Sequence, residues 1–405
     1  MRSIDHRQGP ALVAAPDHAS GSPWGHVLQG AAALAASMGV GRFVYTPILP
    51  LMQAQAGLST SAGASLATAN YVGYLVGALA GIVFPRLVSS QAVLRSSLIV
   101  LTATLLAMPL THAVAAWWAL RLLAGAASAL VFVIAASSLL SHLRGHSAHL
   151  PGWGFGGVGA GIALSGVLVL ILRSVGDWRS GWWASAALAA ALAAASWTLR
   201  PEPSATPAAG STGDARAMLR PRTHRWFSAL FASYALEGVG YIIAGTFLVA
   251  AIEQASPGWL GSGAWVLVGL AAIPSSALWA WLSRRWSRPG VLIAALLLQA
   301  VGIALPALLG GAAAAVISAA LFGATFLGIA TIALAAGAQL QFPRSVALLT
   351  MGYSVGQILG PVVVTPLLHH GYHRAFLLAA LVILAAAAAA GVLRIGFPRF
   401  LPRTT

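Results

Sequence analysis

The stretch RPEPSATPAAGSTGDARAMLRPRT (residues 200–223) is the one long polar interruption in an otherwise apolar chain of 405 residues. Its Pro, Ser, Thr, Gly and Arg content is typical of a flexible linker. Apolar stretches of about 20 residues, the length that crosses a bilayer as a helix, lie on both sides of it. We place these stretches near residues 26–49, 62–85, 91–110, 113–140, 150–172 and 178–199 before the linker, and 226–252, 260–282, 290–309, 311–336, 345–368 and 374–393 after it. The linker therefore divides twelve predicted transmembrane helices into two groups of six.

The composition excludes an ordinary soluble protein. Hydrophobic residues make up 59% of the chain and charged residues 7%, against about 45–50% and about 25% in an average globular domain. The abundant Ala and Gly favour closely packed helices, so we expect an all-α membrane protein. The chain has no cysteine, which excludes disulfides and thiol chemistry. It also has no phosphate-binding loop, which argues against an ATP-driven pump.

The net charge of +15 comes from 22 arginines and no lysine. With the N-terminus inside, seventeen arginines fall in cytoplasmic segments and three in external ones. This asymmetry predicts that both termini are cytoplasmic. We expect a disordered cytoplasmic tail (1–25), an N-terminal bundle (26–199), a cytoplasmic linker (200–223), a C-terminal bundle (224–394) and a cytoplasmic tail (395–405).

The two halves share short motifs at a nearly constant separation. The matches are Gly39-Val40-Gly41 with Gly238-Val239-Gly240, Gly125-Ala126 with Gly323-Ala324, and Val158-Gly159 with Val355-Gly356. Two pseudo-symmetric six-helix bundles, repeated in parallel, are the architecture of major facilitator transporters, whose substrate site lies between the halves near the midplane.

Four segments resemble the major facilitator superfamily, and specifically its YbfB/YjiJ-type bacterial branch. They are GVGRFVYTPILPLM (39–52), ANYVGYLVGALAG (69–81), GVGAGIALSG (157–166) and YSVGQILGPVV (353–363). The resemblance implies a multi-pass transporter of the bacterial inner membrane. It also implies a part in proton coupling for Arg121, which Gly125 follows four residues later, as in the family's fourth span. The alternative is that Arg121 only packs helices together.

Further residues match family motifs that the resemblance associates with helix packing and hinges. Gly157 and Gly161 resemble the glycine motif of antiporters, which favours export. Gly356, Gly360 and Pro361 form a closer version in the eleventh span. The loop after the second span lacks the Asp that the family usually carries there, so the usual charged contact between the halves is in doubt.

Three charged residues stand out because they lie well inside predicted spans: Arg42, Arg121 and Glu237. Each costs at least about 2.5–3.5 kcal/mol on insertion scales, so we expect each to face protein or water. Tyr45 and Thr46 follow Arg42 at the spacing that shares one helix face, and Pro47 is expected to bend the helix. Arg42 either serves substrate or coupling, or only ties helices together through backbone carbonyls.

Glu237 lies near the middle of the seventh span, with Tyr234 and Tyr241 on the same stripe. A low-dielectric site favours the protonated form of a carboxyl group, which suits proton uptake and release. The alternative is a permanent structural ion pair with an arginine. If Arg42 were that partner, transport would require the pair to break and reform.

Softer candidates are polar residues one helical turn apart: Asn70 with Tyr74, and Tyr353 with Gln357. They either hydrogen-bond substrate or join helices. Glycines and prolines complete the set that we expect to pack or bend helices: Gly39, Gly41, Pro47, Gly125, Gly157, Gly161, Gly356, Gly360 and Pro361, with a further kink at Pro274.

Together these features predict a secondary active transporter that works by alternating access, coupled to protons or another ion and directed toward export. The charges of Arg42, Arg121 and Glu237 sum to a net positive site, which favours an anionic or strongly polar small molecule. We expect a monomer in the bilayer, with no metal, cofactor or nucleic acid. The alternative is an integral-membrane enzyme such as a lipid-linked transferase. The small number of Asp and Glu residues in the chain argues against such an enzyme. A sensor would more naturally carry a soluble output domain.

Overall fold

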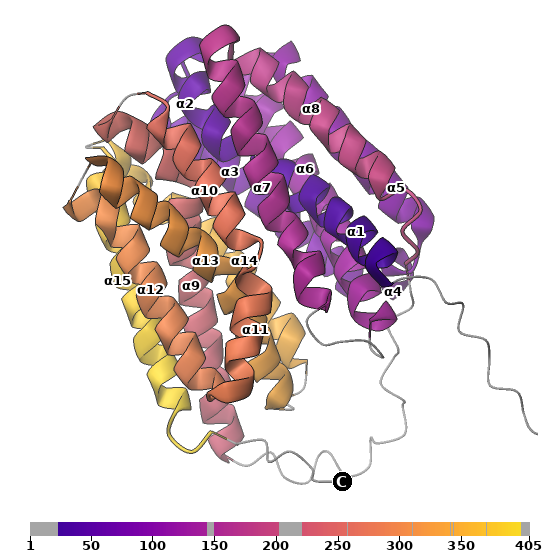
Figure 1. The fold of residues 1–405 in the computed structure, drawn as a ribbon, viewed down its shortest axis with the longest axis vertical. Helices are drawn as coiled ribbons and strands as arrows, with labels where there is room; N and C mark the ends of the chain where they lie inside the picture. The colour runs from indigo at the N-terminus through magenta and orange to yellow at the C-terminus, as the bar shows by residue number, and fades with distance from the viewer. Residues whose placement is uncertain are drawn as a thin grey trace, which may run out of the picture.

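The computed structural model describes residues 23–143, 150–201, 221–256, 258–309, 311–340, 342, 344–369 and 371–397. These residues form helices and no strands. Figure 1 shows two helical bundles side by side, one from the indigo-to-magenta half of the chain and one from the orange-to-yellow half. Most of the predicted N-terminal tail, linker and C-terminal tail lies outside the described residues.

The N-terminal bundle begins with a composite first span and ends just before the linker. Its elements are α1 (Pro23–Leu34), the π-helical turn η1 (Ala35–Val40), α2 (Tyr45–Ala56), α3 (Thr60–Val83), α4 (Pro85–Val88), α5 (Gln91–Ala107), the 3₁₀ turn η2 (Met108–Leu110), α6 (Val114–His142), α7 (Leu150–Val175) and α8 (Trp178–Ala195).

The C-terminal bundle follows the same order of spans. Its elements are α9 (Pro221–Ala255), α10 (Leu260–Ala272), α11 (Ser275–Arg285), α12 (Arg288–Leu308), α13 (Gly311–Gln339), α14 (Ser345–Leu368) and α15 (His373–Leu393). Helices α10 and α11 meet at a bend of 44°. Pro274 lies at this bend, as predicted, because proline cannot donate to the helical ladder. Helix α14 continues through Pro361.

The predicted fold class is confirmed. Within the described residues, ten helices are long and apolar enough to cross a membrane, and the bent pair makes eleven. Helix α8 occupies the remaining predicted position. It has 18 residues, and its polar first turn, WRSG, lowers its mean hydropathy. Asp177 caps it by accepting the Ser180 N–H at 2.9 Å, and this hydrogen bond lowers the pKa of the Asp177 carboxyl.

The first span loses its regular helical hydrogen bonding between residues 35 and 44. The Phe43 N–H donates to the carbonyl of Met38, five residues back, at 3.1 Å. Pro47 explains the break, because its ring displaces the carbonyl of Phe43 and it has no N–H to donate there. The Thr46 N–H then bonds to Phe43 O at 3.2 Å, which leaves the Arg42 carbonyl free for another donor.

Glycine gives both bundles the same close helix crossings. A Cβ on Gly125 of α6 would lie 2.9 Å from the Tyr74 N of α3, and one on Gly323 of α13 would lie 2.9 Å from the Val268 backbone of α10. These crossings occupy equivalent places, as the predicted repeat requires.

Two glycines of α7 that the family resemblance singled out pack within the N-terminal bundle. A Cβ on Gly161 would lie 2.9 Å from the Gly39 Cα, and Gly157 lies against the Ala31 backbone. In the C-terminal bundle, Gly356 and Gly360 pack on α9 in the same way, against residues from Ala235 to Ile243. Both pairs therefore hold helices of one bundle together.

The packing of Gly161 predicts a stability defect. Gly161→Ala adds a methyl group 2.5 Å from Ala35 O, so the backbones of α1 and α7 must separate. We expect a loss of about 1–3 kcal/mol, typical of overpacking, seen as a lower unfolding temperature of the purified protein in detergent. The same change at Gly391, where nothing lies within 4 Å, serves as the control. If Gly161→Ala and Gly391→Ala were equally stable, the close packing of Gly161 against the first span would be contradicted.

Candidate functional site

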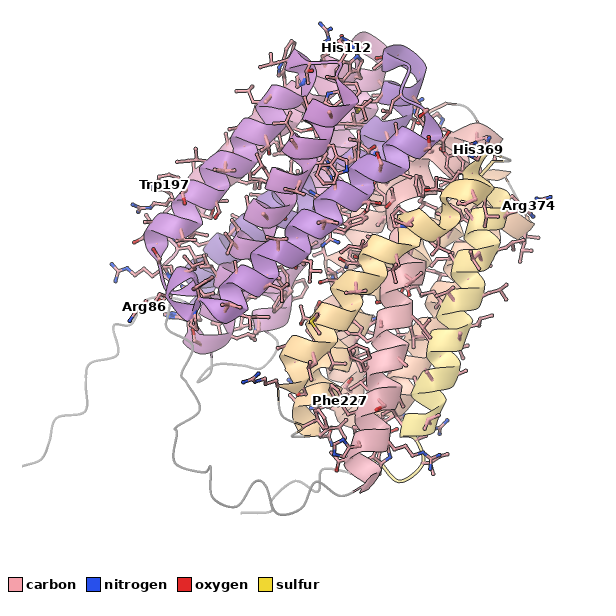
Figure 2. The ribbon with its side chains drawn as sticks, turned by 180° about the vertical axis from the view of Figure 1, so that it is seen from behind. Arg86, His112, Trp197, Phe227, His369 and Arg374 are labelled. Atoms are coloured by element: carbon pink, nitrogen blue, oxygen red, sulfur yellow. The ribbon has the colours of Figure 1, made fainter. Side chains whose placement is uncertain are left out.

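Among the described residues the two bundles meet mainly through α3 with α14, α7 with α10, α7 with α11, and α2 with α9. Figure 2 shows the bundles close together toward the end that carries His112 and His369, whereas Arg86 and Phe227 lie apart at the opposite end. We call these the Arg173 end and the Arg86 end, after an arginine at each. The candidate residues lie between the ends, along the seam of the bundles.

Arg42 lies in the broken segment of the first span and is 3% exposed. Its Nη2 donates to Gln357 Oε1 of α14 at 2.6 Å, and Gln357 Nε2 donates to the Tyr241 hydroxyl of α9 at 2.8 Å. One buried hydrogen-bonded chain thus joins the N-terminal bundle to two helices of the C-terminal bundle. Three residues predicted separately therefore share one site.

Aromatic rings surround the Arg42 guanidinium. Its Cζ lies 4.4 Å from the centroid of Tyr74 and 4.9 Å from that of Tyr71, both on α3. Cation–π contacts of this kind stabilise a buried guanidinium. Tyr71, which sequence reasoning missed, also hydrogen-bonds Thr246 of α9 at 2.7 Å. The sequence signal that could have identified Tyr71 is its position directly after the candidate residue Asn70.

Arg121 supports the broken segment. Its Nη1 and Nη2 donate to the carbonyls of Gly41 and Arg42, each at 3.2 Å. Asn70 Nδ2 in turn donates to the Arg121 carbonyl at 2.9 Å. Arg121 thus satisfies backbone groups that the break exposes, and Asn70 joins α3 to α6.

Tyr45 does not share the surroundings of Arg42. Its hydroxyl donates to Gly63 O at 2.8 Å, and its ring lies 4.8 Å from the Arg121 guanidinium. Thr46 points toward α9, where its hydroxyl donates to Gly245 O at 2.5 Å. The expected common face fails because the break removes the regular helical repeat between residues 41 and 44.

Glu237 lies inside the C-terminal bundle and is fully buried. Its Oε1 accepts a long hydrogen bond of 3.4 Å from Gln299 Nε2 of α12, and its Oε2 has no partner within the described part of the chain. The ion pair with an arginine that we considered, with Arg42 or any other, is therefore not formed in this structure. Gln299 was missed, although it is the one strongly polar residue of its span.

Tyrosines from α9 and α14 form a stack of nearly parallel rings. Tyr353 stacks on Tyr234 at 4.3 Å and 12° and on Tyr241 at 5.4 Å and 9°. Tyr241 lies parallel to Phe326 of α13 at 6.1 Å and 5°. Glu237 lies on the same face of α9 as Tyr234 and Tyr241, three residues from one and four from the other. Tyr241 thus belongs both to the hydrogen-bonded chain from Arg42 and to the stripe that carries the buried carboxyl group.

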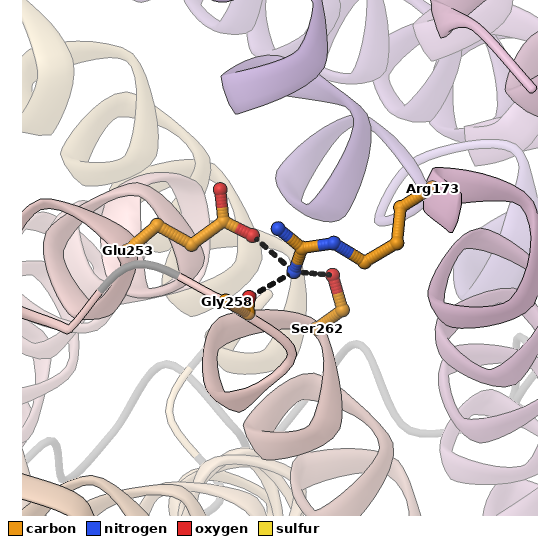
Figure 3. Close-up of polar contacts among 4 residues, drawn as sticks. All are labelled: Arg173, Glu253, Gly258 and Ser262. Carbon is orange, nitrogen blue, oxygen red and sulfur yellow. Dashed lines mark hydrogen bonds and ion pairs between the residues drawn. The ribbon is translucent and has the colours of Figure 1, made fainter.

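An ion pair joins the bundles at the Arg173 end (Figure 3). Arg173 Nη1 of α7 lies 2.9 Å from Glu253 Oε1 of α9, and it also donates to the Gly258 carbonyl and to Ser262 Oγ. A cavity of about 370 Å³ lies beside it and reaches Gln53, Thr60 and Tyr372. Sequence reasoning counted Arg173 only as a loop charge, because it could not say which helices meet.

The structure and its site define a membrane transporter of the major facilitator type, and comparison with known proteins identifies the branch. Residues 34–392 match the family described as "Uncharacterised MFS-type transporter YbfB". The chain therefore belongs to this family. A search of the curated proteins finds no match.

Two solved structures of the nucleoside transporter NupG share the fold. One has a TM-score of 0.64 and 16% identity, covering 92% of this chain and 100% of the other. The second, of a mutant, has a TM-score of 0.63 and 17% identity, covering 92% and 98%. The predicted transporter class is confirmed, and the alternative of a membrane enzyme is not favoured.

The Arg173–Glu253 ion pair predicts a change in accessibility. Because the chain has no cysteine, Leu58→Cys places a single thiol in the cavity at this end. Adding Arg173→Ala should speed its labelling by a maleimide about fivefold, since a pair worth about 1 kcal/mol shifts an equilibrium by that factor. Arg179→Ala at the same end, where Arg179 contacts His112 of its own bundle, is the control. If the labelling rate is unchanged by Arg173→Ala, the Arg173–Glu253 ion pair does not hold the Arg173 end closed.

Proposed function

We propose that the chain is a secondary active transporter that exports an anionic or strongly polar small molecule by alternating access, driven by protons. The observation that carries the proposal is the buried hydrogen bond from Arg42 to Gln357 across the two bundles. A charged group at the seam of two rocking bundles can contact solute from either side. The bilayer and the proton gradient are its other partners, and we propose that it acts as a monomer.

The charge of Arg42 supports an anionic or polar solute. An arginine stays protonated in proteins, so its charge must be matched by other groups. The three acids among the described residues are Asp177, Glu237 and Glu253, and none contacts Arg42 or Arg121. Among the described residues only uncharged groups accept hydrogen bonds from the two guanidiniums, which leaves positive charge for a solute to match.

The surroundings of Glu237 support a proton site. An ionised carboxyl buried without a cation is costly, so the protonated form is favoured. The single 3.4 Å contact with Gln299 is suited to a neutral group. When the bundles move and water reaches it, Glu237 can release its proton. Arg121 acts in this proposal as a positioning residue, because its guanidinium holds the backbone of Arg42.

The distribution of contacts supports alternation between two states. In this structure the polar contacts between bundles lie at the seam and toward the Arg173 end, namely Thr46 with Gly245, Tyr71 with Thr246, Gln53 with Tyr372, and Arg173 with Glu253. We propose that the structure represents the state open toward the Arg86 end. The opposite state requires these contacts to break.

We further propose that the Arg86 end is cytoplasmic and that the chain lies in a bacterial inner membrane with both termini inside. The test uses two exposed serines, Ser89 near Arg86 and Ser174 next to Arg173. In intact cells an impermeant maleimide should label Ser174→Cys and should label Ser89→Cys only after permeabilisation. The reverse pattern would invert the topology.

Glu237→Gln tests proton coupling. A screen of metabolites and drugs on overexpressing and deletion cells first identifies a transported solute. In everted vesicles that carry an imposed pH gradient, this solute should then release protons with the parent chain and not with Glu237→Gln. Exchange of labelled for unlabelled solute should persist in the variant, because the carboxamide keeps the size of the side chain.

Asp177→Asn is the matched control, since it also converts an acid to its amide but lies at the exposed start of α8. It should leave proton movement unchanged. Proton release at the parent rate in Glu237→Gln would remove Glu237 from the mechanism. Solute uptake into right-side-out vesicles driven by an inward proton gradient would reverse the proposed direction of transport.

A further inference from the structure

The groups around Arg42 fit one class of ligand more closely than any other. Building on the transport function proposed above, we propose that the Arg42 site binds a planar aromatic monocarboxylate, with its carboxylate on Arg42 and its ring parallel to the tyrosine stack. Three features of the site carry this assignment: the donors of Arg42, the orientation of the neighbouring rings and the commitment of Arg121.

Arg42 presents a pair of donors of which one has no partner and the other has a neutral partner. Its Nε is buried and has no partner in the described part of the chain, and its Nη2 donates only to the neutral amide of Gln357. These two N–H groups lie on one edge of the guanidinium, the geometry that takes both oxygens of a carboxylate. A ligand carboxylate would thus replace Gln357 Oε1 and also satisfy Nε.

The rings that lie beyond Gln357 in the C-terminal bundle share one orientation. The angle between the planes of successive rings is at most 12° along the series Tyr234, Tyr353, Tyr241 and Phe326. Gln357 hydrogen-bonds Tyr241, so a ligand that displaces this amide arrives next to the stack. A flat aromatic ring gains offset stacking there, whereas an aliphatic group does not.

The second arginine limits the charge of the ligand. Both terminal nitrogens of Arg121 are bonded to the carbonyls of Gly41 and Arg42, and its ring contact is with Tyr45. Releasing it would leave the broken backbone of the first span unsatisfied. Arg121 Nε also has no partner in the described part of the chain, but Nη2, the other donor on that edge, is held by the Arg42 carbonyl. Arg42 is therefore the guanidinium whose partner, a neutral side-chain amide, can be displaced, which matches a monocarboxylate better than a phosphate dianion.

The experiment measures equilibrium binding to the purified full-length chain in detergent. Radiolabelled benzoate is the probe, and unlabelled benzoate, cyclohexanecarboxylate and benzamide compete with it. We expect benzoate to compete best, since cyclohexanecarboxylate lacks the flat ring and benzamide lacks the charge. Equal competition by cyclohexanecarboxylate overturns the aromatic assignment, and equal competition by benzamide overturns the carboxylate assignment.

Variants locate the site. Arg42→Gln should weaken benzoate binding about tenfold or more, the effect of losing a charge-assisted pair. Arg95→Gln is the control, because Arg95 also lies on an aromatic ring, that of Trp197, but at the Arg86 end. Gln357→Leu should tighten binding, since the ligand no longer competes with the amide. Unchanged binding in Arg42→Gln, or weaker binding in Gln357→Leu, refutes the proposal.

If Arg42→Gln does not fold, Gln357→Leu and the conservative Arg42→Lys decide the question. Arg42→Lys keeps the charge but loses the paired donors, so binding should still weaken. The outcome is separable from the proposed transport function. Proton-linked export of another solute without benzoate binding defeats only this inference, whereas benzoate binding without proton-linked transport defeats only the coupling.

Discussion

A guanidinium within the span of a bilayer must find all its partners in the protein, and the centre of this structure is arranged around that requirement. Arg42 reaches the seam of the bundles because the first span is irregular upstream of Pro47. The same irregularity frees backbone carbonyls, and Arg121 binds them. The irregular segment therefore accounts both for the position of Arg42 and for the contacts of Arg121.

The contacts of the two bundles differ in kind along the seam. At the centre the bundles are joined by hydrogen bonds between Arg42 or Tyr71 and an uncharged partner. The Arg173 end instead carries an ion pair between two charged side chains. In the proposed mechanism a charged solute replaces the neutral partner Gln357, because the exchange improves the match to Arg42. The ion pair between bundles is proposed instead to hold one end shut until the bundles move.

The sequence predicted the fold because that information is local. Span lengths, the bend at Pro274 and the glycine repeats all follow from composition and spacing. Sequence reasoning also selected the charged candidates of the site, since a charge inside an apolar span is conspicuous. What it could not give was partners distant in sequence. Gln299 lies 62 residues from Glu237, and only the packing of α9 on α12 brings them together.

The expectation that Tyr45 shares the face of Arg42 failed for a different reason. It assumed a regular helix, and the hydrogen bonds between residues 36 and 46 show that the helix is not regular there. The prolines were recognised as a cause of bending, but the position of the break was not, because it depends on which carbonyls the neighbouring helices can satisfy.

Helix α7 carries glycine on two sides. Gly161 lies on the first span of its own bundle, whereas Gly159 lies against the backbone of Gly269 and Ile273 in the partner bundle. Because glycine has no side chain, the backbones approach closely on both sides of α7. A side chain at Gly159 would therefore push the two bundles apart, whereas one at Gly161 would separate two helices of the same bundle.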